Sequence, residues 1–177
     1  MRFALCIFYA LLLALLGGCA AGPRNLEPVP FRLVLSADND INPDMHGRAT
    51  PVVVRVYELR TASNFESVDF FSLFEKEQAV LGADLIQREE VVLRPTETRQ
   101  ISRRAHPEAR VIGIVAAYRD LERATWRTVV HLPPPTEVST LPVVGPYVTM
   151  SPREQQILIQ LKHQSIFINQ GKASLFR

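Results

Sequence analysis

The chain has 177 residues and carries 20 basic and 18 acidic side chains, which give it a formal net charge of +2. This near balance argues against a nucleic-acid-binding surface, which needs lysine and arginine side chains clustered on one face. The length fits one domain of ordinary size that can bury its own core.

The first residues have the three regions of a secretory signal peptide. Arg2 supplies a positive charge, residues 3–16 form an apolar run, and two glycines stand before Cys19. The run is shorter than the roughly 20 residues that a membrane-spanning helix needs, so a retained transmembrane segment is the weaker interpretation. The end of the run, the two glycines and the cysteine fit the lipobox of a bacterial lipoprotein. An ordinary secretory signal that ends near a cysteine is the alternative.

A lipobox predicts that residues 1–18 are removed as the signal peptide and that Cys19 carries acyl chains. Because alanine and not aspartate follows at Ala20, we expect the mature protein at the outer membrane, lipid-anchored and facing the periplasm. Residues 19–30 contain several proline and glycine residues and are predicted to form a tether, with the folded domain at residues 31–177. The other cysteine lies in the signal peptide, so the mature domain has no disulfide to stabilise it.

The first predicted strand is followed by a long loop. Phe31, Leu33 and Leu35 occupy every second position, which is the period of a strand with one buried face. Residues 38–48 are rich in residue types that favour turns, and the segment is too long for a tight hairpin. A binding loop and a passive connection are both possible for such a segment, and its turn-forming residues favour the binding loop.

A β-branched run at residues 51–59 predicts the next strand, with part of its length buried on both faces. The period then changes. A capping box at Ser63 and Glu66 and apolar residues at helical spacing predict short helices over residues 64–81, ended by Gly82. Four phenylalanines of this insertion form either a partner-binding surface or a cluster that packs the helices onto the sheets, and their spacing favours packing: Phe65, Phe70, Phe71 and Phe74.

The rest of the chain is predicted to form short strands. We expect them at about residues 86–93, 99–101, 111–118, 126–132, 157–161 and 165–168. The third and fourth of these are expected to pair, the last two to form a hairpin, and the proline-rich segment 133–153 to run from one sheet to another or along a sheet edge. Seven to eight strands without alternating helices indicate a mainly β protein, a β-sandwich with a short helical insertion.

No pattern in the sequence points to catalysis. The four histidines are far apart and lack the spacing of metal ligands. A nucleophile elbow and a glycine-rich phosphate loop are both missing from the sequence. We therefore expect a protein that is not an enzyme and that has no metal site, no cofactor and no small-molecule substrate.

Several segments behind the lipobox resemble one known family, in the family's order. They are Ser36-Ala37-Asp38 with Ile41-Asn42-Pro43-Asp44, the strand at 51–60, residues 65–74, and residues 116–121 with Trp126-Arg127. Over this stretch the chain is similar to TssJ, the outer-membrane lipoprotein of the bacterial type VI secretion system. The family often has Pro-Gly-Glu where this chain has Pro95-Thr96-Glu97, and beyond Pro133 the match is weak.

The resemblance implies a transthyretin-like β-sandwich with added helices and a role in anchoring an envelope-spanning membrane complex. In the family, the loop between the first two strands contacts the periplasmic C-terminal region of the inner-membrane protein TssM, and TssL belongs to the same complex. By position, this implies contact through Ile41, Asn42, Pro43, Asp44, Met45 and His46. A lipid-anchored periplasmic module that captures a small ligand or a peptide is the alternative function, and a lipoprotein enzyme has the least support.

Overall fold

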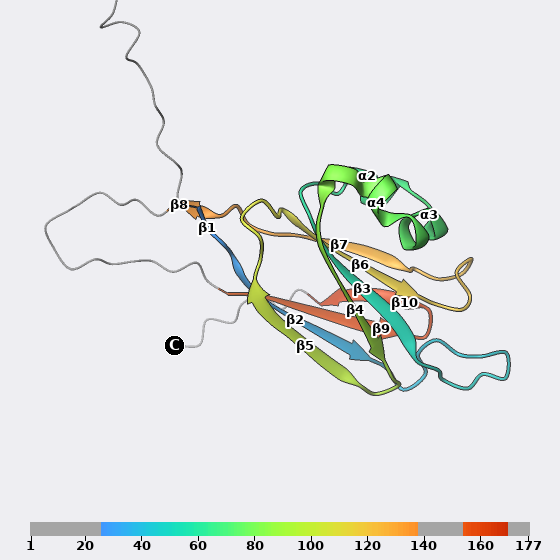
Figure 1. Ribbon diagram of the computed structural model, residues 1–177. Coiled ribbons are helices and arrows are strands. Elements are labelled where there is room, and N and C mark those ends of the chain that lie inside the picture. Colours follow the sequence, from blue (N-terminus) through green and yellow to red (C-terminus); the bar gives the residue numbers. More distant parts are fainter. Residues whose placement is uncertain (1–25, 138–153, 170–177) are drawn as a thin grey trace, which may run out of the picture.

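The computed structural model describes residues 26–137 and 154–169, and in them two four-stranded sheets pack face to face (Figure 1). The first sheet has the order β10-β9-β2-β5, with β2 (Pro30–Ala37), β5 (Thr98–Arg104), β9 (Gln155–Lys162) and β10 (Ser165–Asn169). The second has the order β4-β3-β6-β7, with β3 (Val52–Leu59), β4 (Leu85–Leu93), β6 (Val111–Ala117) and β7 (Arg127–His131). The predicted mainly β sandwich of seven to eight strands is therefore confirmed.

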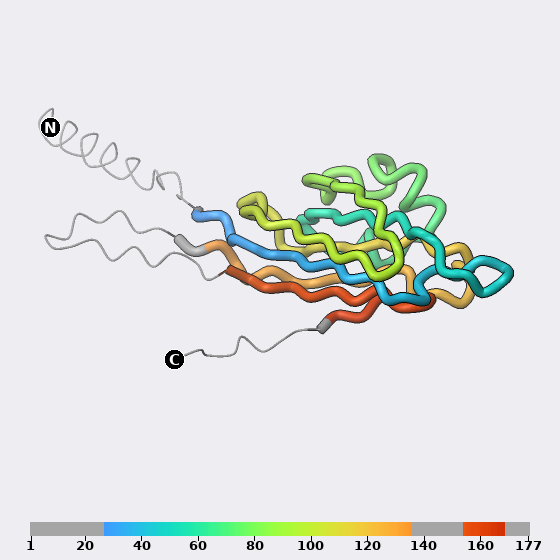
Figure 2. The backbone as a smooth tube through the Cα atoms, turned by 90° about the horizontal axis from the view of Figure 1, so that it is seen from below, coloured from blue at the N-terminus to red at the C-terminus, as the bar shows by residue number. Residues whose placement is uncertain are grey.

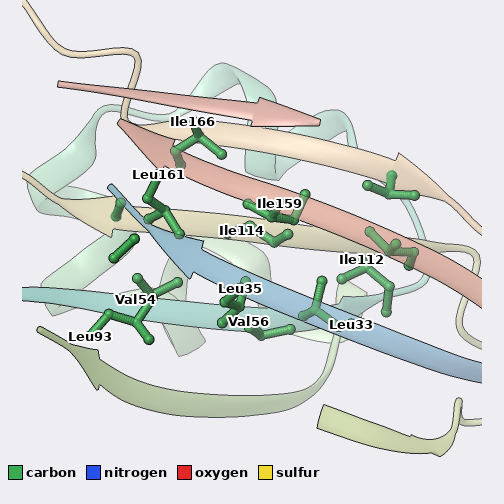
Figure 3. Close-up of a cluster of buried hydrophobic side chains, with 14 of the residues drawn as sticks. Leu33, Leu35, Val54, Val56, Leu93, Ile112, Ile114, Ile159, Leu161 and Ile166 are labelled. Carbon is green, nitrogen blue, oxygen red and sulfur yellow. The ribbon is translucent and has the colours of Figure 1, made fainter. Parts of the chain in front are cut away.

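The alternation predicted for the first strand is present in β2. Phe31, Leu33 and Leu35 are fully buried and point into the space between the two sheets, while the residues between them are half-buried on the outer face. Figure 3 shows the side chains that fill this space from both sheets. Because β2 lies between β5 and β9, with which it pairs antiparallel and parallel respectively, it is a central strand of its sheet.

Strand β3 is buried on both faces over its second half, as predicted for part of its length. Its even-numbered valines face the other sheet, while Tyr57 and Leu59 face the helices on the outer side. Figure 1 shows these helices over the second sheet: α2 (Ser63–Ser67), α3 (Phe70–Glu75) and α4 (Glu77–Leu81), followed by the 3-10 turn η1 (Gly82–Asp84). The helical insertion and its end at Gly82 are therefore as predicted.

The predicted capping box is wrong. The residue before α2 is Ala62, and no side chain caps this helix. The side-chain cap belongs to the next helix, where the carboxylate of Asp69 accepts a hydrogen bond of 3.0 Å from the backbone nitrogen of Ser72. An aspartate before a helix start satisfies a free N–H group in the same way as serine does, and the capped helix start lies six residues after the predicted one.

Of the four phenylalanines of the insertion, Phe65 is the one that is fully buried. Its ring lies against Gly113 of β6, where an added Cβ would come within 2.7 Å of the ring. The missing side chain at Gly113 therefore allows α2 to lie close to the sheet. Phe71 is 62% exposed and contacts the edge of Phe70 at 5.5 Å between ring centroids. Phe65, with the partly buried Phe70 and Phe74, therefore packs the helices onto the sheet, and Phe71 lies at the surface.

The remaining strands follow the predicted pattern. β6 and β7 pair antiparallel, and β9 and β10 form a hairpin whose turn is His163-Gln164. The segment from residue 133 leads from β7 in the second sheet to β9 in the first, and its residues 138–153 lie outside the described part of the chain.

The folded chain begins before Phe31. The short strand β1 (Leu26–Glu27) pairs antiparallel with β8 (Thr136–Glu137), and Val29 is buried. Residues 26–30, which the sequence suggested as part of the tether, are therefore in contact with the domain.

Thr96, in the turn between β4 and β5, has a φ of 65°. A β-branched residue in this region is strained by about 1–3 kcal/mol. Thr96→Gly should raise the free energy of unfolding by about 1 kcal/mol, because the relief of strain is partly offset by the freedom of glycine in the unfolded chain. Chemical denaturation checks this. Thr98→Gly, within the regular strand β5, should be destabilising, and a destabilised Thr96→Gly protein would contradict the assignment of strain.

The two ends of β2 lie at opposite ends of the molecule. Its start adjoins β1, through which the chain enters the domain, and its end leads into the loop before β3 (Figures 1 and 2).

Within the described residues, no helix has the length and the apolar character to cross a membrane.

Candidate functional site

The loop from Asp38 to Pro51 connects β2 of the first sheet to β3 of the second, and it extends beyond the end of the sandwich (Figure 2). The turns between β4 and β5, β6 and β7, and β9 and β10 lie at the same end. The ends of β4 and β6 pair with the start of β3, and the start of β5 and the end of β9 pair with the end of β2. The loop therefore lies beside three neighbouring turns, at residues 94–97, 118–126 and 163–164, which are called the platform below.

The base of the loop is buried. Ile41 is fully buried, and Asn42 is 3% exposed. The backbone nitrogen of Thr50 donates to the carbonyl of Ile41 at 3.1 Å, so the two arms of the loop meet at this point. The first two of the six residues that the sequence suggested for contact thus hold the loop on the domain.

The tip of the loop is folded around Asp44. Its carboxylate accepts from the backbone nitrogens of His46 at 2.8 Å and Arg48 at 3.0 Å, and from Nε of Arg48 at 2.8 Å. Two backbone hydrogen bonds of 2.9 Å, from Asp44 to the carbonyl of Arg48 and from Gly47 to the carbonyl of Asp44, close the turn. Gly47 has a φ of 75°, which glycine adopts without strain. The tip is therefore a defined turn, although it has no regular secondary structure.

Met45 and His46 stand at the outer end of this turn. Met45 is 92% exposed, the highest value among the exposed large hydrophobic side chains of the described residues. His46 is exposed, and Pro43 and Asp44 are half-buried. An ordered turn thus holds an apolar, flexible thioether in water, and side chains of this kind adapt to the irregular surfaces of other proteins.

The structure brings to the loop residues that sequence reasoning did not select. Arg119, in the turn after β6, donates from Nε to the hydroxyl of Thr50 at 3.2 Å. His163, in the turn after β9, lies 3.3 Å from a carboxylate oxygen of Asp40. Their distance along the chain left no local signal by which to find them. In the described segments of the chain, no group of three or more His, Cys, Asp and Glu side chains is arranged to hold a metal ion.

The pKa of the Asp44 carboxyl is held below 3.8, first by the side-chain hydrogen bond from Arg48 and then by the backbone N–H groups of Arg48 and His46. A lowered pKa means that the ordered turn is more stable when the Asp44 carboxyl is ionised. Its stabilisation is complete above pH 3.8 and is lost as the pH falls through the lowered pKa.

We therefore expect the amides of His46 and Arg48 to keep their NMR shifts from neutral pH down to about pH 4 and to move toward unstructured values as the pH falls further, through the lowered pKa of Asp44. Asp44→Ala should show the acid-state shifts at neutral pH. Amide shifts in Asp44→Ala that match the unmodified protein would contradict this role of the carboxylate.

Comparison with known proteins points to one family. The sequence model described as "Type VI secretion lipoprotein, VasD, EvfM, TssJ" matches residues 30–169. The crystal structure of the type VI secretion lipoprotein TssJ1 from Pseudomonas aeruginosa is similar with a TM-score of 0.71 and 35% sequence identity, covering 83% of this chain and 99% of that chain. Lip from Serratia marcescens, described as a membrane-bound component of the type VI secretion system, has a TM-score of 0.68 and 28% identity, covering 82% of this chain and 99% of that chain.

A structure described as the C-terminal domain of the type VI secretion protein TssM from EAEC contains a chain that is similar in fold, with a TM-score of 0.58 and 23% identity over 79% of this chain and 97% of that chain. No curated protein matches the chain. The family match extends from β2 to the end of β10 and includes the loop described above. The chain therefore belongs to the family of type VI secretion lipoproteins.

Proposed function

We propose that the chain is the outer-membrane-anchored lipoprotein subunit of a type VI secretion membrane complex. In this proposal, acyl chains on Cys19 hold it at the periplasmic side of the outer membrane, and its β2–β3 loop binds the periplasmic C-terminal region of TssM, with TssL in the same complex. The observation that carries the proposal is the ordered, outward-facing turn with Met45 and His46 at its tip.

The position of the loop suits a link between two attachment points. The tether enters the domain next to β1, and residues 19–25 span at most about 25 Å when fully extended. The eight residues of β2 then lead away from that point, about 26 Å at 3.3 Å per residue. This geometry supports a loop that faces the periplasm, on the side of the domain away from the proposed lipid.

The order of the tip favours its use as a binding surface. A loop that is already fixed in its bound conformation avoids the entropy cost of ordering on association. Contact is assigned first to Met45 and His46, with Pro43 and Asp44 beside them. Ile41 and Asn42 support these four residues from the buried base of the loop. The proposed role consists of recognition and anchoring and includes no catalytic step.

The double substitution Met45→Ala with His46→Ala should weaken binding of the TssM periplasmic region by about tenfold or more, since exposed side chains that become buried at an interface centre carry most of its binding energy. Both side chains are exposed, so the free energy of unfolding should change by less than about 0.5 kcal/mol for each. Isothermal titration and thermal unfolding measure the two quantities.

Phe71→Ala is the matched control, because Phe71 is also a large exposed hydrophobic residue but lies on α3 and not on the loop. It should leave the dissociation constant unchanged. If the control weakens TssM binding and the loop variant does not, the contact surface lies over the helices and the proposed loop contact is wrong.

A further inference from the structure

Asn42 joins four separate segments of the chain by hydrogen bonds. Its side-chain nitrogen Nδ2 donates to the carbonyl of Pro51 at 2.7 Å and to the hydroxyl of Thr50 at 3.1 Å. Its Oδ1 accepts from the backbone nitrogen of Arg119 at 2.8 Å. Its own backbone nitrogen donates to the carbonyl of His163 at 2.9 Å. The two arms of the β2–β3 loop and the turns after β6 and β9 thus meet at one residue, with the turn after β9 joined through its backbone and the others through its side chain.

The site requires the properties of asparagine. The residue is 3% exposed, so an unpaired polar atom here would be costly. Its φ is 48°, a region that asparagine enters more readily than most residues other than glycine. Aspartate would supply no donor for Pro51 and Thr50, and glycine would fit the backbone but make none of the side-chain bonds.

The bonds at Asn42 fix where the tip points. The hydroxyl of Thr50 donates to the backbone carbonyl of Asn42 at 2.5 Å and accepts from Nε of Arg119, so the far arm of the loop is held to the same platform. Beyond this closure, the described contacts that order the tip are those around Asp44, which fold the turn but do not attach it to the sandwich. The direction of Met45 relative to the domain therefore depends on the base.

We infer that Asn42 is a positioning residue for partner binding: it does not touch the partner, but it sets the orientation in which Met45 and His46 meet it. The inference rests on the proposed function, because that function defines the tip as the contact surface. It adds that two turns distant in sequence, at Arg119 and His163, take part in recognition through Asn42.

The test compares Asn42→Gly with Asn39→Gly, the same change at an exposed asparagine earlier in the loop. If loss of the bonds leaves the tip correctly oriented for about a tenth of the time, the dissociation constant for the TssM periplasmic region should rise about tenfold. Asn39→Gly should leave it unchanged. Adding Met45→Ala should weaken binding by the same factor in the Asn42→Gly protein as in the unmodified one, because the bound complex, with the tip correctly oriented, contains the same Met45 contact in both.

Amide hydrogen exchange supplies a readout that does not involve the partner. In Asn42→Gly, the amides of Gly47, Arg48 and Thr50 should exchange faster, while those of the central strands β3 and β6 keep their protection. Unchanged exchange at the loop amides, or an equal rise in the central strands, would overturn the positioning role. If the unmodified protein does not bind TssM, the proposed function fails, and the exchange pattern still decides whether Asn42 orders the tip.

Discussion

Replacing Arg103 by leucine is expected to lower the free energy of unfolding by about 3–5 kcal/mol, because it leaves a buried carboxylate without its partner. Glu58 on β3 is 1% exposed and accepts from Nε of Arg103 on β5 at 2.9 Å and from the backbone nitrogen of His106 at 2.8 Å. The other arm of Arg103 donates to Glu89 on β4 at 2.6 Å. One guanidinium therefore joins the two sheets on the side of the sandwich where β5 is the edge strand of the first sheet and β4 is the edge strand of the second.

Two further variants separate this effect from a general loss of charge. The double variant Glu58→Leu with Arg103→Leu should be more stable than Arg103→Leu alone, because no buried charge is then left unpaired. Arg104→Leu is the control for an exposed pair, since Arg104 contacts Glu27 at 3.1 Å and is 57% exposed. Its effect should be below about 1 kcal/mol. Equal effects of the Arg103 and Arg104 substitutions in urea unfolding would contradict the inter-sheet role.

Cys19→Ala should move the protein from the membrane fraction to the soluble periplasmic fraction, with the domain still folded. The cysteine carries the proposed acyl chains, and attachment through two or more chains is stable where a single chain gives only reversible binding. The described domain contains no cysteine, so the substitution removes no disulfide. Density-gradient fractionation with a far-UV circular dichroism spectrum of the soluble form measures both parts of this expectation.

A variant at the residue after the anchor tests the choice of membrane. Ala20→Asp should shift the lipidated protein from the outer to the inner membrane, because retention there depends on aspartate after the lipidated cysteine. Membrane association of the Cys19→Ala protein would count against lipid anchoring, and outer-membrane location of Ala20→Asp would count against the sorting argument.

The strands were predictable where burial imposes a simple period. Phe31, Leu33 and Leu35 alternate because one face of β2 meets the second sheet and the other meets solvent. The β-branched run at the start of β3 was equally informative, since this strand is covered by the first sheet on one face and by the helices on the other. Such patterns show which faces of a strand are buried, and they can be read without knowing which strands pair with it.

The roles of the individual loop residues were not predictable, because a loop has no hydrophobic period and its contacts come from distant segments. The sequence identified residues 38–48 as a long turn-rich loop, but it could not separate buried Ile41 and Asn42 from exposed Met45 and His46, because a loop has no period to show which side faces inward. The partners of Asn42 at Arg119 and His163 are contributed by strand pairing far along the chain. Register, and not local sequence, brings these groups together.

Binding of TssM through the β2–β3 loop is tested by titrating the TssM periplasmic region against two forms of the mature domain. One is the unmodified protein, and in the other residues 43–48 are replaced by a Gly-Ser segment of equal length. The dissociation constant should be at least about 100-fold higher for the replaced loop, as expected when the central contacts of an interface are removed. The sandwich should keep its thermal unfolding midpoint within a few degrees. Equal affinity of the two proteins for TssM would show that this loop is not the contact surface.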